Sequence, residues 1–213
     1  MASPPESLPH EVSADDPREL DITDEERVER FREAGYGWNV SDALRNVAVR
    51  EAVLSQEFSP LEAGTVVAGR ALPVKPHSHI ETEAERDRLR ERWERESGHP
   101  QRRMMQRVRE RPDSSGLRFD CGGDMQPARF GELSCALAEA SGCRGMIVAG
   151  NTRDTKYVIE MEFPAFCFGT TPNAFGGWDI TDVDVPIHLP GHLTHYVEVH
   201  PGTSCSATAT ASR

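Results

Sequence analysis

Residues 145–154, Gly-Met-Ile-Val-Ala-Gly-Asn-Thr-Arg-Asp, constrain the fold of this chain more than any other stretch. Residues 146–149 are four consecutive apolar side chains, a run short enough for a buried strand. Glycine and asparagine at 150–151 both tolerate a positive φ, which predicts a sharp turn there. Such a turn would deliver Arg153 and Asp154 to the end of a core strand, where α/β folds tend to bind ligands.

The two charged residues are open to two interpretations. An arginine fork suits a carboxylate or a phosphate, and an aspartate suits a hard divalent cation. A charged pair in a turn is equally typical of a surface salt bridge that binds nothing. The local sequence does not choose between these interpretations.

Around this stretch the pattern alternates between helices and strands. A capping box at 23–26 predicts a helix to about residue 34, and Pro127 predicts the start of another that ends near residue 141. Strands are expected at 65–73, closed by Pro73, and at 117–121, 146–149, 163–168, 179–185 and 196–199, with a short helix near 156–161. This alternation predicts an α/β fold, a single compact sandwich with a mixed sheet.

Three stretches differ in composition from the rest. Residues 1–23 are rich in Pro, Ser, Asp and Glu and are expected to form a disordered acidic tail. Residues 80–111 are rich in arginine and interspersed acids, and we interpret them as solvated helices within the domain. Residues 203–213 are a low-complexity Ser/Ala/Thr tail without a packing pattern, which leaves 24–202 as the folded domain.

Composition excludes several classes of protein. The net charge of -11 argues against nucleic acid as a partner, and no apolar run approaches the roughly 20 residues that span a bilayer. The N-terminus has neither a basic start nor an apolar segment, so no secretory signal is expected. The five cysteines are odd in number and none has CxxC spacing, which favours free thiols in a reducing cytoplasm.

A second group of residues could join Arg153 and Asp154. Glu132, Leu133 and Ser134 lie in the first turn of the helix after Gly122–Gly123, where backbone amides lack helical partners and attract anions. Twenty residues separate Glu132 from Arg153, enough for a helix, a turn and a strand. If the helix start and the strand end share one edge, the pocket could hold a 2-oxo acid: the amides and Arg153 would bind its carboxylate. Asp154 would hold a divalent cation that stabilises an enolate.

Five motifs in the same order resemble the RraA-like family. They are Gly-Arg-Ala-Leu-Pro at 69–73, Gly-Glu-Leu at 131–133, the 145–154 stretch, Phe-Pro-Ala-Phe at 163–166 and Val-Pro at 185–186. That family includes the regulator of ribonuclease activity A and class II 4-hydroxy-4-methyl-2-oxoglutarate aldolases, and its members are often labelled demethylmenaquinone methyltransferase-like. The resemblance covers about residues 24–202.

The resemblance implies a role for each residue of the candidate site. In the aldolases of the family, the amides at Leu133 and Ser134 and the guanidinium at Arg153 bind the carboxylate of pyruvate. The carboxylate at Asp154 supports Mg²⁺ or Mn²⁺ largely through waters, and the acid at Glu132 orients water or metal. The resemblance also implies a homotrimer, or a hexamer of two trimers, with sites at subunit boundaries.

Two departures from the family pattern stand out. Metal-dependent members often have an acid three residues after the metal aspartate, where this chain has Tyr157. After Pro201-Gly202 the family continues with an acidic segment, a strand and a helix, which the Ser/Ala/Thr tail replaces here. We therefore expect a truncated or frame-shifted chain of reduced stability with an open strand edge.

Three functions follow as hypotheses. The first is a divalent-metal-dependent lyase that cleaves 4-hydroxy-2-oxo acids to pyruvate, with oxaloacetate decarboxylation as a side activity. The second is a non-catalytic binding protein similar to the ribonuclease regulator. The third is a degenerate homologue with neither function.

Overall fold

The computed structural model describes residues 22–33, 37–46, 49, 52–78, 82–95, 100–110, 115–174 and 178–208. The acidic tail expected at residues 1–23 therefore lies outside the described residues, apart from residues 22 and 23. Thr23 caps the first helix as the capping box predicts, since its Oγ1 accepts a hydrogen bond of 3.1 Å from the amide of Glu26. Among the described helices, none is long and apolar enough to cross a bilayer.

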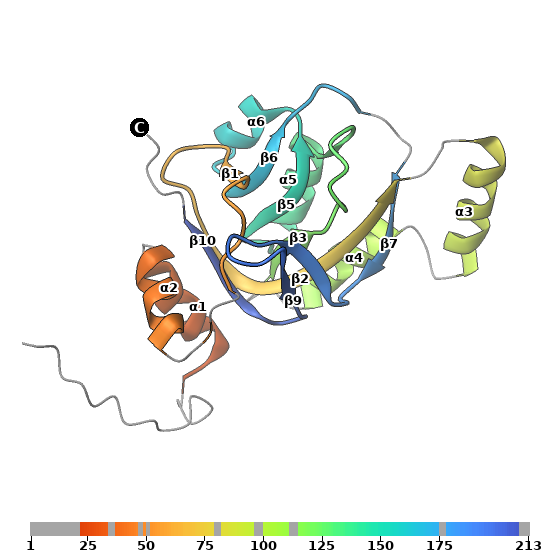
Figure 1. Ribbon diagram of the computed structural model, residues 1–213. Coiled ribbons are helices and arrows are strands. Elements are labelled where there is room, and N and C mark those ends of the chain that lie inside the picture. The colour runs from red at the N-terminus through yellow and green to blue at the C-terminus, as the bar shows by residue number, and fades with distance from the viewer. Residues whose placement is uncertain are drawn as a thin grey trace, which may run out of the picture.

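Helices and strands alternate along the chain (Figure 1). The helices are α1 (Asp24–Glu33), α2 (Gly37–Asn46), α3 (Glu83–Arg95), α4 (Pro100–Glu110), α5 (Glu132–Ala140) and α6 (Thr155–Glu160). The strands are β1 (Ser59–Pro60), β2 (Val66–Ser78), β3 (Ser115–Phe119), β4 (Ala128–Phe130), β5 (Gly145–Thr152), β6 (Ala165–Thr170), β7 (Trp178–Val183), β8 (Ile187–Pro190), β9 (Tyr196–Val199) and β10 (Ser204–Thr208).

One mixed sheet of eight strands organises the fold. Its main order is β1-β6-β5-β3-β2-β10, with β4 paired to β5 and β7 paired to β2. The central strands β6, β5, β3 and β2 run parallel, whereas β1, β7 and β10 pair antiparallel with their neighbours. The predicted single-domain α/β fold with a mixed sheet is confirmed.

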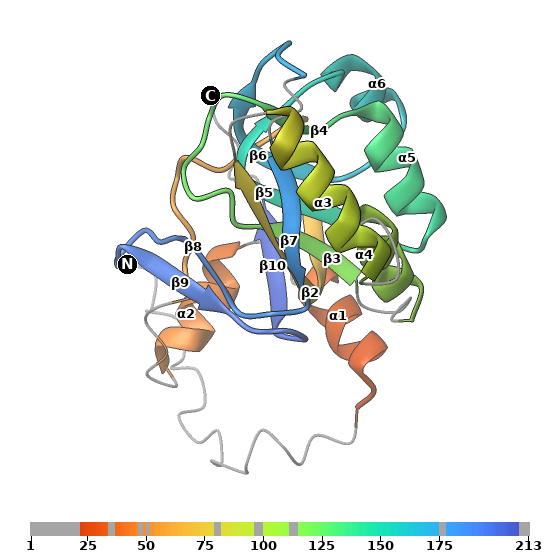
Figure 2. The same cartoon turned by 90° about the vertical axis from the view of Figure 1, so that its right-hand side faces the viewer.

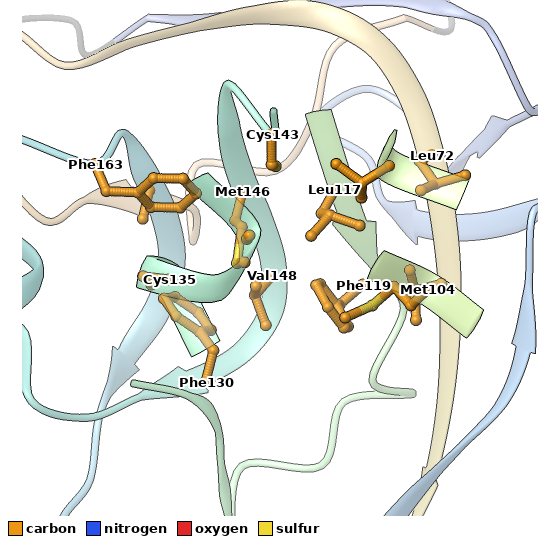
Figure 3. Packing of buried hydrophobic residues seen from close by; sticks show 14 of the residues in the cluster. Leu72, Met104, Leu117, Phe119, Phe130, Cys135, Cys143, Met146, Val148 and Phe163 are labelled. Atoms are coloured by element: carbon orange, nitrogen blue, oxygen red, sulfur yellow. The ribbon is translucent and has the colours of Figure 1, made fainter. Parts of the chain in front are cut away.

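Two layers cover the sheet (Figure 2). On one face α4 and α5 pack over an apolar cluster that includes Met104, Leu117, Cys135, Met146 and Phe163 (Figure 3). On the other face the β8–β9 hairpin closes a smaller cluster around Ile147, Phe166, Ile187 and Leu189. Because both faces are covered, the parallel strands have mostly apolar side chains on both sides, as buried parallel sheets require, and Arg118 of β3 is a buried charged exception.

The expectation that Pro73 closes its strand is wrong. β2 continues to Ser78, and Pro73 pairs in register with Arg118 of the parallel strand β3. The carbonyl of Pro73 accepts a hydrogen bond of 2.8 Å from the amide of Asp184, just beyond the end of β7. The N–H and C=O groups of one strand residue point to the same side of the strand. Because the carbonyl of Pro73 points toward Asp184, the N–H that proline lacks would also point there, and the hydrogen bonds between β2 and β3 do not depend on it.

Two further expectations fail because strand pairing overrides local propensity. No helix begins at Pro127: residues 128–130 form β4 beside the end of β5, and α5 begins at Glu132. The low-complexity stretch is not without a packing pattern either, since residues 204–208 form β10 against residues 66–70 of β2. β10 pairs with residues 66–70 of β2 and β7 with residues 74–78, so β2 is paired along this edge.

Candidate functional site

The start of α5 and the end of β5 lie side by side, because β4 carries the first to the second. β4 runs parallel to β5, with Phe130 in register with Thr152. The carbonyl of Phe130 accepts hydrogen bonds of 3.1 Å from the amide of Arg153 and from Oγ1 of Thr152. The helix start and the strand end therefore share one edge, which is the condition that the hypothesis of a common pocket required.

The chain does not turn at Gly150 and Asn151 as expected. Both residues belong to β5, where Asn151 pairs with Gly169 of β6 and with Ala128 of β4, and the register with β6 shifts between Val148 and Asn151. The turn comes at Asp154, whose φ of 54° and ψ of 30° lie in the left-handed region. An aspartate tolerates this conformation better than most residues, and Asp154 becomes the N-cap of α6.

The N-terminus of α5 has free backbone donors. Its N-cap residue is Gly131, which provides no side chain to accept the first-turn amides, and the first intrahelical bond runs from Cys135 to the carbonyl of Gly131. The amides of Glu132, Leu133 and Ser134 precede that bond. Unpaired amides and the positive end of the helix dipole make this turn an anion-binding position.

Gly131 lets Arg153 and Asp154 approach this turn. A Cβ at position 131 would lie 2.4 Å from Oδ2 of Asp154 and 3.0 Å from Cγ of Arg153. Both distances are shorter than ordinary carbon contacts, so any larger residue would push the charged pair away from the helix start. Glycine at 131 is thus required by the close approach of the two segments.

Arg153 and Asp154 form a loose ion pair on the surface. The distance from Nε of Arg153 to Oδ2 of Asp154 is 3.5 Å, and the side chains are 44% and 41% exposed. Exposed pairs of this kind contribute about 0–1 kcal/mol. The salt bridge and the site are therefore compatible interpretations, since an incoming anion or cation can separate the pair at little cost.

The remaining predicted residues lie at the rim of this corner. Glu132 is exposed at the first position of α5, Leu133 is 83% exposed, and Ser134 is half-buried. Tyr157 lies one turn along α6, and its amide donates to the carbonyl of Asp154 at 3.0 Å. The Arg153–Asp154 corner, defined by residues 131–134 and 153–154, is an open surface. Cavities of about 1050 and 410 Å³ lie elsewhere, beside α1 and beneath α2.

The donor set of the corner suits one kind of metal ion. Within the part of the chain that the structure describes, no three His, Cys, Asp or Glu side chains converge on one point. Asp154 and Glu132 offer carboxylate oxygens, which suit Mg²⁺ or Mn²⁺ better than zinc. Mg²⁺ commonly keeps several waters and needs only one or two carboxylates, so these residues fit an ion held largely through water.

The buried cysteines do not take part in this chemistry. Cys121, Cys135, Cys143 and Cys167 are free and buried. Burial raises the pKa of Cys121 and of Cys135 to about 12 and that of Cys167 to about 11. Thiols that stay protonated at neutral pH are poor nucleophiles, which agrees with their role as small core residues.

A buried polar network beside the corner was not predicted. Arg129 of β4 donates from Nη2 to Oγ of Ser78 at 2.8 Å and to Oδ2 of Asp124 at 2.7 Å. Its guanidinium lies 5.2 Å from the centroid of the Trp178 ring. The only local signal is an arginine between two apolar residues of a short strand, because its partners are distant in sequence.

Comparisons with known proteins identify the family and relatives of this chain. The family model described as RraA-like, Aldolase/RraA, matches residues 38–208. A protein from Halalkalibacterium halodurans named "Putative 4-hydroxy-4-methyl-2-oxoglutarate aldolase" is 34% identical over 84 residues, 39% of this chain and 38% of that protein. A protein of the same name from Xanthomonas campestris pv. campestris is 29% identical over 89 residues, 40% of this chain and 54% of its own length. The matches thus span about half or less of these curated relatives.

Solved structures share the fold at low identity. A structure described as that of novel cellulases from gut-associated microbes has a TM-score of 0.70 at 22% identity, covering 89% of this chain and 76% of the other. RraAS2 of Streptomyces coelicolor, described as an unusual member of the RNase ES inhibitor RraA family, has a TM-score of 0.55 at 22% identity, covering 79% and 73%. With the family model matching most of the sequence and the fold agreeing, the chain belongs to the RraA-like family.

Proposed function

We propose that this protein is a divalent-metal-dependent lyase that cleaves 4-hydroxy-2-oxo acids to pyruvate and decarboxylates oxaloacetate as a side activity. The observation that carries the proposal is the close approach of Arg153 and Asp154 to Gly131, where no Cβ would fit without displacing them, which brings the first-turn amides, a cation and a carboxylate together. The relatives named as aldolases support the same reaction class.

The substrate carboxylate would bind between the helix start and Arg153. The amides of Leu133 and Ser134 point out of the first turn of α5, and the guanidinium of Arg153 provides a planar fork. Charge-assisted hydrogen bonds of this kind are roughly twice as strong as neutral ones. This arrangement would fix the 2-oxo group of the substrate next to Asp154.

Asp154 would hold Mg²⁺ or Mn²⁺ largely through waters, with Glu132 as the second nearby acid. When bound, the cation would supply Lewis-acid stabilisation of the negative charge that develops on the 2-oxo group. Glu132 would orient the water that takes the proton of the C4 hydroxyl. As that proton leaves, C4 becomes the carbonyl carbon of the second product, the C3–C4 bond breaks, its electron pair forms the pyruvate enolate, and C3 then takes a proton from water.

Oxaloacetate would follow the same path with a different leaving group. The bond between C3 and the C4 carboxylate breaks, CO₂ leaves, and the same enolate remains. Arg153 and the amides hold the C1 carboxylate in both reactions, so one site serves both substrates.

The surface beside the corner supports a homotrimer or a hexamer. Leu133 and Leu137 are four residues apart on α5, and they are 83% and 39% exposed. Exposed leucines on one helix face are typical of a surface that another subunit covers. A second copy of this chain seated there would close the open corner, and we propose that it does so in the cytoplasm.

One residue favours a second candidate function. Tyr157 stands on α6 where metal-dependent relatives often have an acid, and it is 49% exposed. A missing ligand would weaken the metal, so the alternative is a binding protein similar to the ribonuclease regulators. In that role the corner would bind a partner rather than turn over a substrate.

Pyruvate release from oxaloacetate tests the proposal in the native protein, in Arg153→Ala and in Asp154→Ala, each with and without Mg²⁺. We expect Mg²⁺-dependent release by the native protein and a loss of about a hundredfold or more in both variants, the size seen when one oxyanion donor is removed. Equal, metal-independent background rates in all three proteins would instead favour the binding role.

A further inference from the structure

The position of the α5 N-terminus depends on what anchors β4. β4 has only three residues and pairs with β5 alone. The loop before it contains Gly122 and Gly123 with φ values of 59° and 77°, both exposed. Such a loop has little stiffness of its own, so the helix start must be held by contacts of β4 and of the loop with the rest of the fold.

Arg129 is the strongest of these contacts. Its side chain is 1% exposed and bridges two segments: Ser78 at the end of β2 and Asp124 in the loop. Asp124 also accepts a hydrogen bond from Ser78 and one of 2.9 Å from the amide of Gln126. Arg129 is held to Ser78 and Asp124 through Nη2, while its Nε and Nη1 have no partner among the described residues, so breaking this pair would leave a buried charge uncompensated.

Two asparagine side chains hold the same loop from the other side. Nδ2 of Asn151, on β5, donates to the carbonyl of Met125 at 2.5 Å. Nδ2 of Asn173, after β6, donates to the carbonyl of Gln126 at 3.1 Å, and the carbonyl of Asn173 accepts the amide of Ala128 at 2.9 Å. The loop is therefore fixed to β5 and β6 by its carbonyls and to β2 by Arg129.

A small movement of β4 would reach the corner directly. Arg129 is followed by Phe130, whose carbonyl accepts the amide of Arg153, and then by Gly131, where a Cβ would collide with Arg153 and Asp154. Any shift of Arg129 therefore changes the gap between the α5 amides and the Arg153 guanidinium. Misplacement of a bound group by about 1 Å can cost about a hundredfold in rate.

We propose, building on the lyase function above, that Arg129 is a positioning residue for this site. Through Ser78 and Asp124 it fixes the separation between the α5 amides and Arg153, and it thereby sets the affinity for the carboxylate of a 2-oxo acid. Arg129 does not touch the substrate.

Oxalate binding in the presence of Mg²⁺, measured by calorimetry, tests this role. Oxalate is a planar dicarboxylate that resembles the enolate of pyruvate and needs no turnover. The variants are Arg129→Met, Arg129→Lys, which retains the charge without the planar fork, and Asp124→Asn. Arg153→Ala is the positive control, and Arg118→Met, which changes a buried arginine of β3 outside the corner, is the matched control.

We expect the Kd for oxalate to rise about tenfold or more in Arg129→Met, less in Arg129→Lys, and not at all in Arg118→Met. A purely structural role would lower the number of binding sites per chain and leave their Kd unchanged. If Arg129→Met does not fold, the Kd values of Arg129→Lys and Asp124→Asn for oxalate test the positioning role instead. Kd values within twofold of the native protein in all folded variants would overturn the positioning role alone, whereas a native protein that does not bind oxalate would overturn the lyase function and this role with it.

Discussion

Two arginines, Arg118 and Arg129, are buried in neighbouring parts of the sheet, and they differ in what surrounds the guanidinium. Arg129 bridges Ser78 and the carboxylate of Asp124 and lies over Trp178. Arg118, on β3, donates from Nη1 only to the carbonyl of Leu117 at 3.1 Å, and its Nε and Nη2 have no partner among the described residues. Nε and Nη1 of Arg129 also have no partner among the described residues, so the two guanidinium groups differ in the counter-charge alone: Asp124 offsets part of the burial cost at Arg129, and no carboxylate among the described residues pairs with Arg118.

The surroundings of Arg118 on its face of the sheet also differ from those of Arg129. Side chains of a strand alternate, so Arg118 points away from Leu117 and Phe119 and toward the cluster under the β8–β9 hairpin. The members of that cluster are apolar side chains, and Arg118 is not one of them. Arg129 is therefore buried beside a counter-charge next to the candidate site, whereas the burial of Arg118 has a desolvation cost without a counter-charge in the described part of the chain.

The largest effect is expected from Arg129→Met. Removing the guanidinium leaves the carboxylate of Asp124 without its counter-charge, and breaking a buried pair in this way costs about 3–5 kcal/mol. The free energy of unfolding in urea measures the loss. A decrease below about 1 kcal/mol, the size of an exposed ion pair, would mean that the network contributes no more than a surface contact.

Arg118→Met should have the opposite sign. Replacing an uncompensated buried charge with an apolar side chain of similar length removes the desolvation cost, and such replacements stabilise by about 1–4 kcal/mol. The same urea experiment measures the gain. A loss of stability would show that Arg118 has a compensating partner in the assembled protein, and the comparison of the two arginines would then fail.

Gly116→Ala tests how tightly Arg118 is confined. A Cβ at position 116 would lie 2.5 Å from Nη1 of Arg118, so the substitution should cost about 1–3 kcal/mol through overpacking. Combining it with Arg118→Met removes the clash, and the double mutant should recover most of that cost. Strict additivity of the two substitutions would indicate that the backbone, and not the guanidinium, rejects the methyl group.

The same two arginines show why part of this protein could not be predicted from its sequence. The residues of the corner could be proposed from the sequence because their signals are local, namely first-turn amides of a helix and an apolar strand that ends in Arg153 and Asp154, whereas their common edge was only a condition of that proposal. The partners of Arg129 are not local, since Ser78 lies 51 residues away along the chain. Arg118 lies in an apolar run that reads as an ordinary strand, and nothing nearby indicates that its side chain is buried without a counter-charge.

Strand pairing explains the expectations that failed. Gly150 and Asn151 have turn propensity, but the parallel neighbours β4 and β6 hold them in β5. Pro127 has the propensity to begin a helix, but the free edge at the end of β5 makes a strand of residues 128–130. Residues 204–208 have no hydrophobic pattern, and they form β10 because β2 offers an unpaired edge. In each case a tertiary partner outweighs a weak local preference.

The smallest expected effect concerns the pH dependence of the Arg129 network. Partial burial acts to raise the pKa of Asp124, but hydrogen bonds from Ser78 and Gln126 and the charge of Arg129 outweigh it and hold the pKa below its usual value. Because the unfolded carboxyl titrates near pH 3.9, the stabilisation is complete above about pH 4 and is lost as the pH falls through the lower folded pKa.

The free energy of unfolding of the native protein and of Asp124→Asn should therefore differ most at neutral pH and converge below about pH 4. Arg118→Met is the matched control, because Arg118 has no carboxylate partner among the described residues and its difference from the native protein should not follow this titration. A difference between native and Asp124→Asn that stays constant from pH 7 to pH 3 would mean that hydrogen-bond geometry, rather than the charge of Asp124, compensates Arg129. The two buried arginines would then differ in hydrogen-bond geometry and not in charge compensation.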